Sequence, residues 1–163
     1  MFTFAYEMEI HKIETNKKKY LELLLLADEQ ESMVDRYLER GDMFVLFSPK
    51  MAAIGVAVVT DEGNGVCELK NLAVHPDFQR CGYGRKMVEF LCHHYGRSYK
   101  EMMVGTGDST HTVSFYKSCG FQYSHTIPDF FTLNYDHPIV EDGKILRDML
   151  YFRKEISIFR AES

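Results

Sequence analysis

The sequence predicts an α/β fold: a single domain in which helices flank a mixed, mostly antiparallel sheet. Three strand-like segments follow one another between 43 and 74 with short turns, which is typical of an antiparallel meander. A glycine-rich turn then leads into an amphipathic helix at 84–95, and further strand and helix patterns alternate after it. We expect residues 1–163 to form this one domain, with 1–7 as an extension if Met8 is the natural start.

The first half of the chain has the pattern of one strand, two helices and three strands. Alternating apolar and polar residues predict a strand over 9–14, and apolar residues at helical spacing predict helices over 16–27 and 30–40. Gly41 follows the second helix, where a C-terminal cap belongs. The next three strands, separated by turn residues, are expected over 43–48, 51–60 and 66–74.

The second half alternates between helices and strands. The helix over 84–95 carries an apolar stripe and ends before Gly96. The remaining elements are expected as a strand over 101–105, a helix over 110–118, a strand over 121–127, a polar loop over 128–143 and a last strand over 148–159, with Ile156 and Ile158 on its apolar face. Dimerisation through the last strand stays open, because an edge strand can pair with a second copy.

The composition is that of a folded protein with a sizeable core. Its 163 residues are 45% hydrophobic and 26% charged, and the formal net charge is -5. This acidic balance argues against nucleic-acid binding and favours a cationic partner. The longest apolar run, Leu23–Ala27, is far shorter than the ~20 residues that span a bilayer, so no membrane segment is expected. Four cysteines without a CxxC pair or metal-ligand spacing predict free thiols, no metal site and a cytoplasmic location.

The segment after the strand at 66–74 has the chemistry of a phosphate site. Gly82 and Gly84 stand at the beginning of a helix, where backbone N–H groups lack partners and the helix dipole is positive. Neither the GxxxxGK[ST] pattern nor GxGxxG is present, the latter because Met87 replaces its third glycine. Cations at this end of a helix oppose its dipole unless an anion compensates them. The stretch nevertheless carries Arg80, Arg85 and Lys86.

The stretch ELKNLAVHPDFQRCGYG, residues 68–84, resembles the core motif of the GNAT superfamily of acetyl-CoA-dependent N-acetyltransferases. In that family an apolar strand ends in Val-x-Pro and is followed by [QR]-x-x-G-x-[GA]. A second landmark, a helix ending in Tyr followed by Gly-Phe, resembles residues 114–121. The resemblance covers residues 8–157 and implies the acyl-CoA N-acyltransferase fold, acetyl-CoA as co-substrate and acetyl transfer to an amine.

The resemblance also implies which residues hold the coenzyme. The pantetheine arm is expected to lie along Leu72, Ala73 and Val74, with the Leu72 N–H holding the thioester carbonyl and stabilising the oxyanion. Many members have Asn near the start of the following short helix; we place Ser109 there, although we favour a plain helix N-cap for it. The pyrophosphate is expected on Gln79, Arg80, Cys81, Gly82, Tyr83 and Gly84.

Two residues are candidates for proton transfer between the attacking amine and the departing thiolate. Tyr116 matches the family's tyrosine near the coenzyme sulfur and would serve as acid; the alternative is a core tyrosine on a short helix. Glu68 would serve as base, because alternation along its strand puts it on the same face as Leu72. The alternatives are a solvated charge at a strand end, or a water chain in place of a fixed carboxylate.

Two acidic segments predict where a cationic amine would bind, in the regions that set specificity in this family. Asp28 and Glu29 lie between the first two helices. Asp129, Phe130 and Tyr135 lie in the loop before the last strand, where carboxylates attract a cation and aromatic rings pack against it. The alternative is that the aromatic rings plug the end of the core and the acids are solvated.

The sequence therefore predicts an N-acetyltransferase that moves an acetyl group from acetyl-CoA to a small-molecule or peptide amine by direct attack in a ternary complex. The alternative is a non-catalytic acetyl-CoA-binding or sensor module of the same fold. A cysteine hydrolase built on Cys81 is a third idea, which is disfavoured because Cys81 lies inside the phosphate loop and no His–carboxylate pairing is visible.

Overall fold

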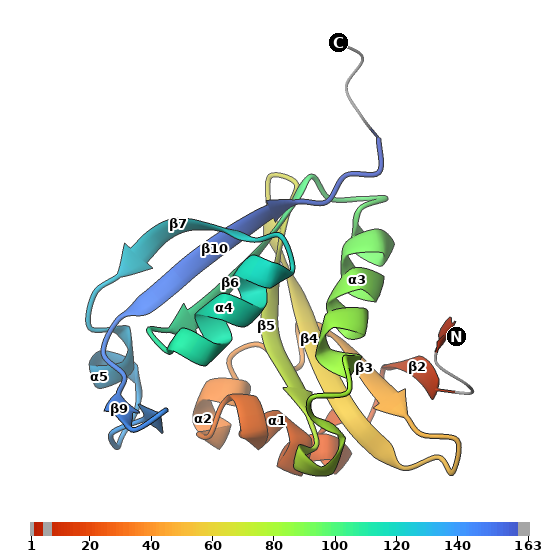
Figure 1. Ribbon diagram of the computed structural model, residues 1–163, viewed down its shortest axis with the longest axis horizontal. Helices are drawn as coiled ribbons and strands as arrows, with labels where there is room; N and C mark the ends of the chain where they lie inside the picture. The colour runs from red at the N-terminus through yellow and green to blue at the C-terminus, as the bar shows by residue number, and fades with distance from the viewer. Residues whose placement is uncertain (1, 5–7, 160–163) are drawn as a thin grey trace. The chain divides into compact units, whose positions relative to one another are not determined.

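The computed structural model describes residues 2–4 and 8–159 (Figure 1). Of the expected extension over 1–7, residues 1 and 5–7 therefore lie outside the described residues. The chain forms two compact units: residues 1–61 with 69–88, and residues 62–68 with 89–163. Strand β5 (Val66–Val74) and helix α3 (Tyr83–Tyr95) each run from one unit into the other.

In the first unit the strands follow their order in the chain. They are β1 (Phe2–Phe4), β2 (Met8–Ile13), β3 (Asp42–Phe47), β4 (Ala53–Gly63) and β5. The pairs β1–β2, β2–β3 and β3–β4 are antiparallel. The predicted strands are confirmed here with small shifts at their ends, and β1 is an addition that the sequence did not reveal.

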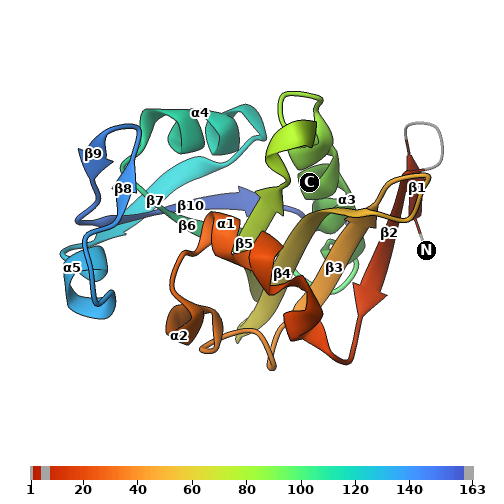
Figure 2. The same cartoon turned by 90° about the horizontal axis from the view of Figure 1, so that it is seen from below.

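The helices of the first unit pack on one face of this sheet (Figure 2). They are a 3-10 turn η1 (Lys17–Tyr20) and the helices α1 (Leu21–Ala27) and α2 (Glu31–Val34). The predicted helix over 30–40 is wrong in length, because only its first turn is an α-helix. Its predicted apolar stripe is nonetheless buried: Met33, Val34, Tyr37 and Leu38 are all at most 6% exposed.

A buried ammonium group binds the end of the segment after α2. Lys17 is 7% exposed, and its Nζ donates to the carbonyl oxygens of Leu38 at 2.9 Å and Gly41 at 2.7 Å. A buried charge needs such partners, since leaving it unpaired is costly. Lys17 therefore caps the carbonyl groups at the end of this segment.

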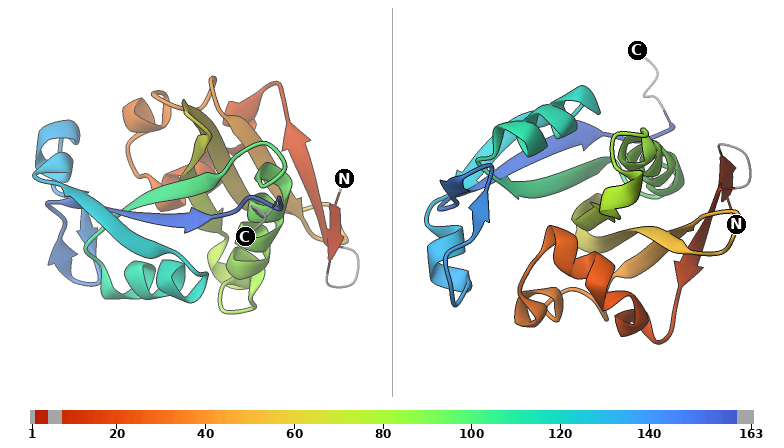
Figure 3. Two further views of the ribbon diagram at one scale, coloured as in Figure 1. Left: turned by 90° about the horizontal axis from the view of Figure 1, so that it is seen from above. Right: turned by 60° about the horizontal axis from the view of Figure 1, so that its bottom comes forward.

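In the second unit the strand order is β5, β6 (Glu101–Gly107), β10 (Met149–Glu155) and β7 (Gln122–Ile127) (Figure 3). The N–H of Lys100 donates to the Gly65 carbonyl at 2.8 Å, so β5 and β6 begin side by side and run in the same direction. The pairs β6–β10 and β10–β7 are antiparallel. The predicted mixed, mostly antiparallel sheet of the α/β class is confirmed.

The last strand is not an edge, which corrects the premise for dimerisation through it. β10 pairs with β6 on one side and β7 on the other. Its neighbouring residues Tyr151 and Phe152, which point to opposite faces, are both buried, as suits a strand covered on both faces. The strand also ends at Glu155, so Ile158 is 46% exposed and does not join the expected apolar face, whereas Ile156 is buried.

The predicted polar loop over 128–143 is folded. It contains helix α5 (Phe130–Asn134) and strand β8 (Val140–Glu141), which forms a hairpin with β9 (Lys144–Ile145). A small apolar cluster of Phe131, Ile139 and Leu146 holds these pieces together. Helix α4 (Thr110–Ser118) lies at its predicted position.

Three further expectations concern the cysteines, metal binding and membrane spans. All four cysteines are free thiols, as predicted. Within residues 2–4 and 8–159, no cluster of His, Cys, Asp and Glu side chains could hold a metal ion. None of the helices in this part of the chain is long and apolar enough to cross a membrane.

Candidate active site

The turn between β5 and α3 has an unusual backbone. Two residues adopt left-handed conformations, Arg80 with φ 63 and Gly82 with φ 84. Left-handed residues at alternate positions turn successive N–H groups toward a concave surface that suits an anion. A Cβ atom built on Gly82 would meet no atom within 4 Å, so the glycine leaves open space beside the loop. The loop therefore has the form of a cradle for an anionic group.

Side chains close this loop onto the end of β5. The Gln79 amide donates from Nε2 to the Val74 carbonyl at 2.9 Å. The His75 N–H donates to the Ile54 carbonyl at 2.7 Å, and its ring Nδ1 accepts from the Asp77 N–H at 3.1 Å before the short 3-10 turn η2 (Pro76–Phe78). Gln79 thus holds the loop in place, and its expected contact with pyrophosphate stays a prediction.

The beginning of α3 lacks a negative group of its own. Its first turn contains no acidic residue, and the exposed Arg85 and Lys86 lie there instead. The helix begins with the Lys86 N–H donating to the Gly82 carbonyl at 3.1 Å. The cradle, the dipole of a 13-residue helix and these cations all suit a diphosphate. Exposed Cys81, whose thiol lies 3.5 Å from the Gln79 carbonyl, is part of the loop.

Strand β5 has one buried face and one more open face. Leu69, Asn71 and Ala73 are between 2% and 7% exposed, whereas Leu72 and Val74 on the other face are half-buried. Leu72 and Val74 are therefore on the side that a ligand can approach, as predicted from alternation. Ala73 points into the core, so it can contact a pantetheine arm only through its backbone.

A buried hydrogen-bonded chain ties Asp28 to this strand. The Asn71 amide, 3% exposed, donates from Nδ2 to the Leu24 carbonyl and to the Tyr37 hydroxyl, both at 3.0 Å. Tyr37 in turn donates to the Asp28 carboxylate at 3.0 Å. Burial, and then the charge of Asp28, raises the pKa of the Tyr37 phenol, so it stays a donor. Glu29 is exposed.

Sequence reasoning missed Asn71 and Tyr37. A signal existed for Asn71, because an amide in the middle of an apolar strand must find buried partners. Nothing in the sequence indicated that the partner would be Tyr37, which had only an apolar role in the predicted stripe. Together the two side chains orient the Asp28 carboxylate, one of the predicted acceptor-binding groups.

Tyr116 is a buried tyrosine with an unused hydroxyl. Its ring lies edge-on to Phe115 at 5.1 Å and to Phe121 at 5.7 Å between centroids. The hydroxyl makes no hydrogen bond to any residue in 2–4 or 8–159. Burial raises the pKa of Tyr116 above its usual range, with smaller effects of Cys119 and Glu141. The phenol is therefore protonated near neutral pH, the form that a general acid requires.

Glu68 is a buried carboxylate, which corrects the alternative of a solvated charge at a strand end. It is 4% exposed, although its strand neighbours Val66 and Lys70 on the same face are only half-buried. The Tyr151 hydroxyl donates to its Oε2 over a long 3.4 Å hydrogen bond. A carboxylate can accept the proton of an amine, so Glu68 stays a candidate base.

Ser109 stands at the N-cap position of α4 without making the expected cap. Its side chain is 3% exposed, and its hydroxyl donates to the Asp142 carboxylate at 2.6 Å instead of accepting from the helix. Asp142 also accepts from the His111 N–H in the first turn. The cap is thus supplied by Asp142 from the β8–β9 turn, which corrects the plain N-cap interpretation of Ser109.

The second predicted acceptor segment is largely committed to internal contacts. The Asp129 carboxylate forms an ion pair with Arg147, and its N–H donates to Asp148 at 2.8 Å. Phe130 and Tyr135 pack on the buried Phe131 in the small cluster of this segment. The rings therefore fill a core here, in agreement with the alternative given for them, and Asp129 attracts a cation less than an unpaired carboxylate would.

The predicted residues are divided between the two units. Asp28, Leu72, Ala73, Val74 and the loop from Gln79 to Gly84 lie in the first unit with Glu29, and Glu68, Ser109, Tyr116, Asp129, Phe130 and Tyr135 lie in the second. The structure brings Asp28 close to the β5 residue Asn71, and it brings Glu68 close to Tyr151. It places Ser109 against Asp142 and not against another predicted residue.

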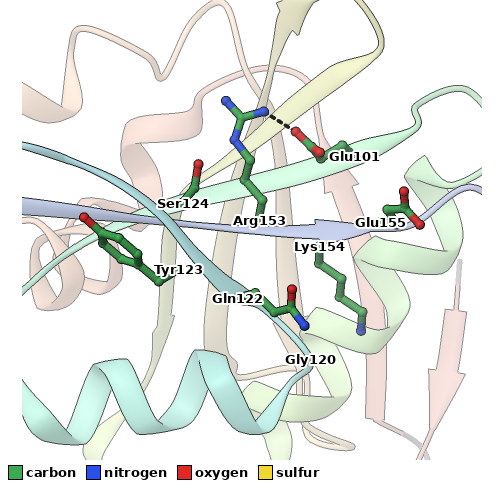
Figure 4. A pocket seen from close by; sticks show the side chains of 8 residues that line it. All are labelled: Glu101, Gly120, Gln122, Tyr123, Ser124, Arg153, Lys154 and Glu155. Carbon is green, nitrogen blue, oxygen red and sulfur yellow. Dashed lines mark hydrogen bonds and ion pairs between the residues drawn. The ribbon is translucent and has the colours of Figure 1, made fainter.

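A groove elsewhere on the second unit contains none of the predicted residues (Figure 4). Arg153 lies over it and forms an ion pair with Glu101, as Figure 4 shows. Lys154 donates to the Cys119 carbonyl at 2.7 Å. Both cations of this groove therefore have partners within the protein.

Comparisons with known proteins identify the family of this chain. The model of the acetyltransferase (GNAT) domain matches residues 39–123. An uncharacterised N-acetyltransferase of Bacillus subtilis, YvbK, is 36% identical over 139 residues, 84% of this chain and 88% of that protein. A GNAT-family acetyltransferase from Elizabethkingia anophelis, crystallised with acetyl-CoA, is 29% identical with a TM-score of 0.87, covering 93% of this chain and 99% of that one.

A Bacillus subtilis acetyltransferase crystallised with CoA is also similar, with 31% identity and a TM-score of 0.83 over 91% of this chain and 99% of that one. The fold thus defines an acyltransferase of the α/β class. The chain belongs to the GNAT acetyltransferase family and is an N-acetyltransferase. The resemblance drawn from residues 68–84 and 114–121 is confirmed.

We expect Asp142→Asn to lower the free energy of unfolding near neutral pH, because Asn loses the charge that caps α4. The hydrogen bond from Ser109, ahead of the amide and charge of His111, lowers the pKa of Asp142. A lowered pKa stabilises the fold above the unfolded-state pKa, and this stabilisation is lost as pH falls through the folded-state value. Urea unfolding of both proteins should therefore differ near neutral pH and converge in strong acid.

Asp136→Asn is the matched control, because it removes a carboxylate of the same segment that lies outside this cap. It should change the unfolding free energy little at either pH. A deficit of Asp142→Asn that persists unchanged in strong acid would show that the charge of Asp142 does not cap the helix.

Proposed function

We propose that the protein transfers the acetyl group of acetyl-CoA to the primary amine of a cationic small molecule or peptide, by direct attack in a ternary complex. The observation that carries this proposal is the loop from Gln79 to Gly84, with its left-handed Arg80 and Gly82 at the N-terminus of α3. Similar proteins crystallised with acetyl-CoA and CoA support the choice of donor. When bound, acetyl-CoA supplies an activated acetyl thioester.

The loop amides and the cations of α3 would hold the diphosphate of the donor. Along β5, the backbone at Leu72, Ala73 and Val74 would pair with the pantetheine arm. The Leu72 N–H would then donate to the thioester oxygen, which becomes negative during attack. This arrangement requires that β5 and β6 separate beyond their paired beginnings, and that separation stays an expectation from the family.

Two buried side chains are proposed to move the protons of the reaction. An ammonium group must lose a proton before it attacks, and Glu68 is proposed to accept that proton, directly or through water. Tyr116 is proposed to give its proton to the departing thiolate. Its unused hydroxyl supports this role, whereas its raised pKa makes it a weaker acid than an ordinary tyrosine.

A cationic acceptor is supported more by Asp28 and Glu29 than by Asp129. Asp28 is held in one orientation by Tyr37, whereas Asp129 is already paired with Arg147. We therefore propose that the segment between α1 and α2 provides the main attraction for the amine. Ser109 is a weaker candidate for the pantetheine contact, because Asp142 already accepts its hydroxyl hydrogen.

Thiol release from acetyl-CoA, measured across polyamines, aminoglycosides, amino acids and N-terminal peptides, tests the proposal. We expect turnover with at least one cationic amine, and a lower KM for that amine than for its neutral analogues. Tight binding of acetyl-CoA without turnover on any amine would favour a sensor module. Equal turnover of cationic and neutral amines would overturn the acceptor class alone.

Gly82→Val should raise the KM for acetyl-CoA by at least about tenfold, because its side chain fills the open space beside the loop where the diphosphate is proposed to lie. Gly63→Val is a matched control. Gly63 has a similar φ of 81, and a Cβ there also meets nothing within 4 Å, so the backbone strain is alike. Both variants are compared by thermal unfolding and by kinetics. An equal KM for acetyl-CoA in the two variants would contradict the loop assignment.

Tyr116→Phe should lower kcat by about 10²-fold with little change in either KM, which is the lower range for a general acid. The ring packing on Phe115 and Phe121 is retained, so the melting temperature should stay close to that of the parent. Steady-state kinetics with the best amine provide the measurement. An unchanged kcat would reduce Tyr116 to a core residue.

A further inference from the structure

A row of three side-by-side residues crosses the sheet of the second unit toward Glu68. His125 on β7 is the register partner of Tyr151 on β10, and Tyr151 is the register partner of Gly105 on β6. Register partners place their side chains on the same face of a sheet. Glu68 on β5 receives the hydroxyl of Tyr151, so the row reaches from the outer strand to the buried carboxylate.

Gly105 is what lets Tyr151 reach that far. A Cβ atom on Gly105 would lie 2.9 Å from Cζ of Tyr151 and 2.8 Å from Sδ of Met149. Real Cβ contacts are longer than this, so any other residue at 105 would push the phenol ring away. The phenol therefore crosses β6 over a residue without a side chain, which is a common use of glycine in a strand.

His125 holds the ring from the other side. The His125 and Tyr151 rings are stacked, with centroids 4.8 Å apart and planes 2° from parallel. A register shift in β7 between the partners of Tyr151 and Phe152 makes this pairing, because His125 then faces Tyr151 while Tyr123 faces Phe152. Such bulges re-aim side chains next to functional sites.

The geometry points to Tyr151 as a positioning residue for Glu68, with Gly105 and His125 fixing the path of its ring. This inference rests on the proposed function, in which Glu68 takes the proton of the amine. The Tyr151 hydroxyl donates to Oε2 of the carboxylate. This hydrogen bond favours the Glu68 rotamer in which Oε2 faces the hydroxyl, and so contributes to where the carboxylate stands.

The environment of Tyr151 agrees with a permanent donor. Burial raises the pKa of its phenol, and the charges of Glu68 and Glu62 raise it further. Tyr151 therefore keeps its hydroxyl hydrogen near neutral pH and stays a hydrogen-bond donor to Glu68. Tyr151 does not contact the reacting atoms and acts only through Glu68.

The kinetic test is a double-mutant cycle between Tyr151→Phe and Glu68→Gln with the best amine of the panel. Loss of one hydrogen bond to a charged group should lower kcat about tenfold in Tyr151→Phe. The same change should have no further effect once Glu68→Gln has removed the base. Equal fold-losses in the two backgrounds would overturn the inference, because Tyr151 would then act independently of Glu68.

Tyr123→Phe is the matched control, since it removes a hydroxyl of the neighbouring strand β7 that bonds only Thr126 among the described contacts. Its kcat should equal that of the parent. Gly105→Ala keeps the Tyr151 hydroxyl but displaces the ring, so it should reproduce the loss of Tyr151→Phe. Full activity of Gly105→Ala, with a folded circular-dichroism spectrum, would overturn the role of the glycine.

Carbon-13 NMR of labelled glutamate separates this inference from the proposed function, because it needs no acceptor. The Glu68 carboxyl signal is assigned by its loss in Glu68→Gln and titrated in the parent, Tyr151→Phe, Gly105→Ala and Tyr123→Phe. The pH midpoint of the Glu68 titration should be higher in Tyr151→Phe and Gly105→Ala than in the parent, because both variants lose a hydrogen-bond donor to the charged carboxylate. A single midpoint in all four proteins would overturn the inference. A shifted midpoint together with full turnover of Glu68→Gln would uphold it and overturn Glu68 as base.

Discussion

Strand β5 carries two buried polar side chains, and the need to pair them shapes both units. An unpaired buried polar group costs about 1–3 kcal/mol, so partners inside the protein are strongly favoured. The Asn71 amide nitrogen donates to the Leu24 carbonyl and the Tyr37 hydroxyl, which fixes the end of α1 and the segment after α2, whereas its Oδ1 has no partner among the described residues. Glu68 finds Tyr151, which requires a glycine on the strand between them. The groups proposed to receive the amine, Asp28 and Glu68, are thus held through β5.

Elements with a strong local signal could be predicted from the sequence. β5 and α4 lie at their predicted residues, and α3 begins one residue early, because apolar spacing and flanking turn residues agree there. The segment 30–40 buries its predicted apolar stripe but is an α-helix only over its first turn. Its last carbonyl groups accept hydrogen bonds from the buried Lys17, which lies 21 and 24 residues away from Leu38 and Gly41 in the chain. Local propensity cannot reveal such a distant partner.

Only those residues of the candidate site that belong to a short sequence motif could be predicted. The loop glycines and Tyr116 belong to such motifs, whereas the partners of the site come from far along the chain. Tyr151 lies 83 residues from Glu68, and Asp142 lies 33 residues from Ser109. The insertion of β10 between β6 and β7 creates the first of these contacts. Alternation showed that Tyr151 was on a strand, but neighbours across a sheet depend on strand order, which one sequence does not specify.

Burial also decides which side chains can exchange protons. It raises the pKa of Tyr37, Tyr116 and Tyr151, so all three phenols keep their hydrogens near neutral pH and act as donors. Two of them, Tyr37 and Tyr151, donate to the carboxylates of Asp28 and Glu68, and the third has no acceptor among the described residues. A phenol already donating to a carboxylate is poorly suited to protonate a thiolate, which supports the proposal that Tyr116 does so. Proton uptake from the amine is proposed for a carboxylate, and of the two only Glu68 is largely shielded from water.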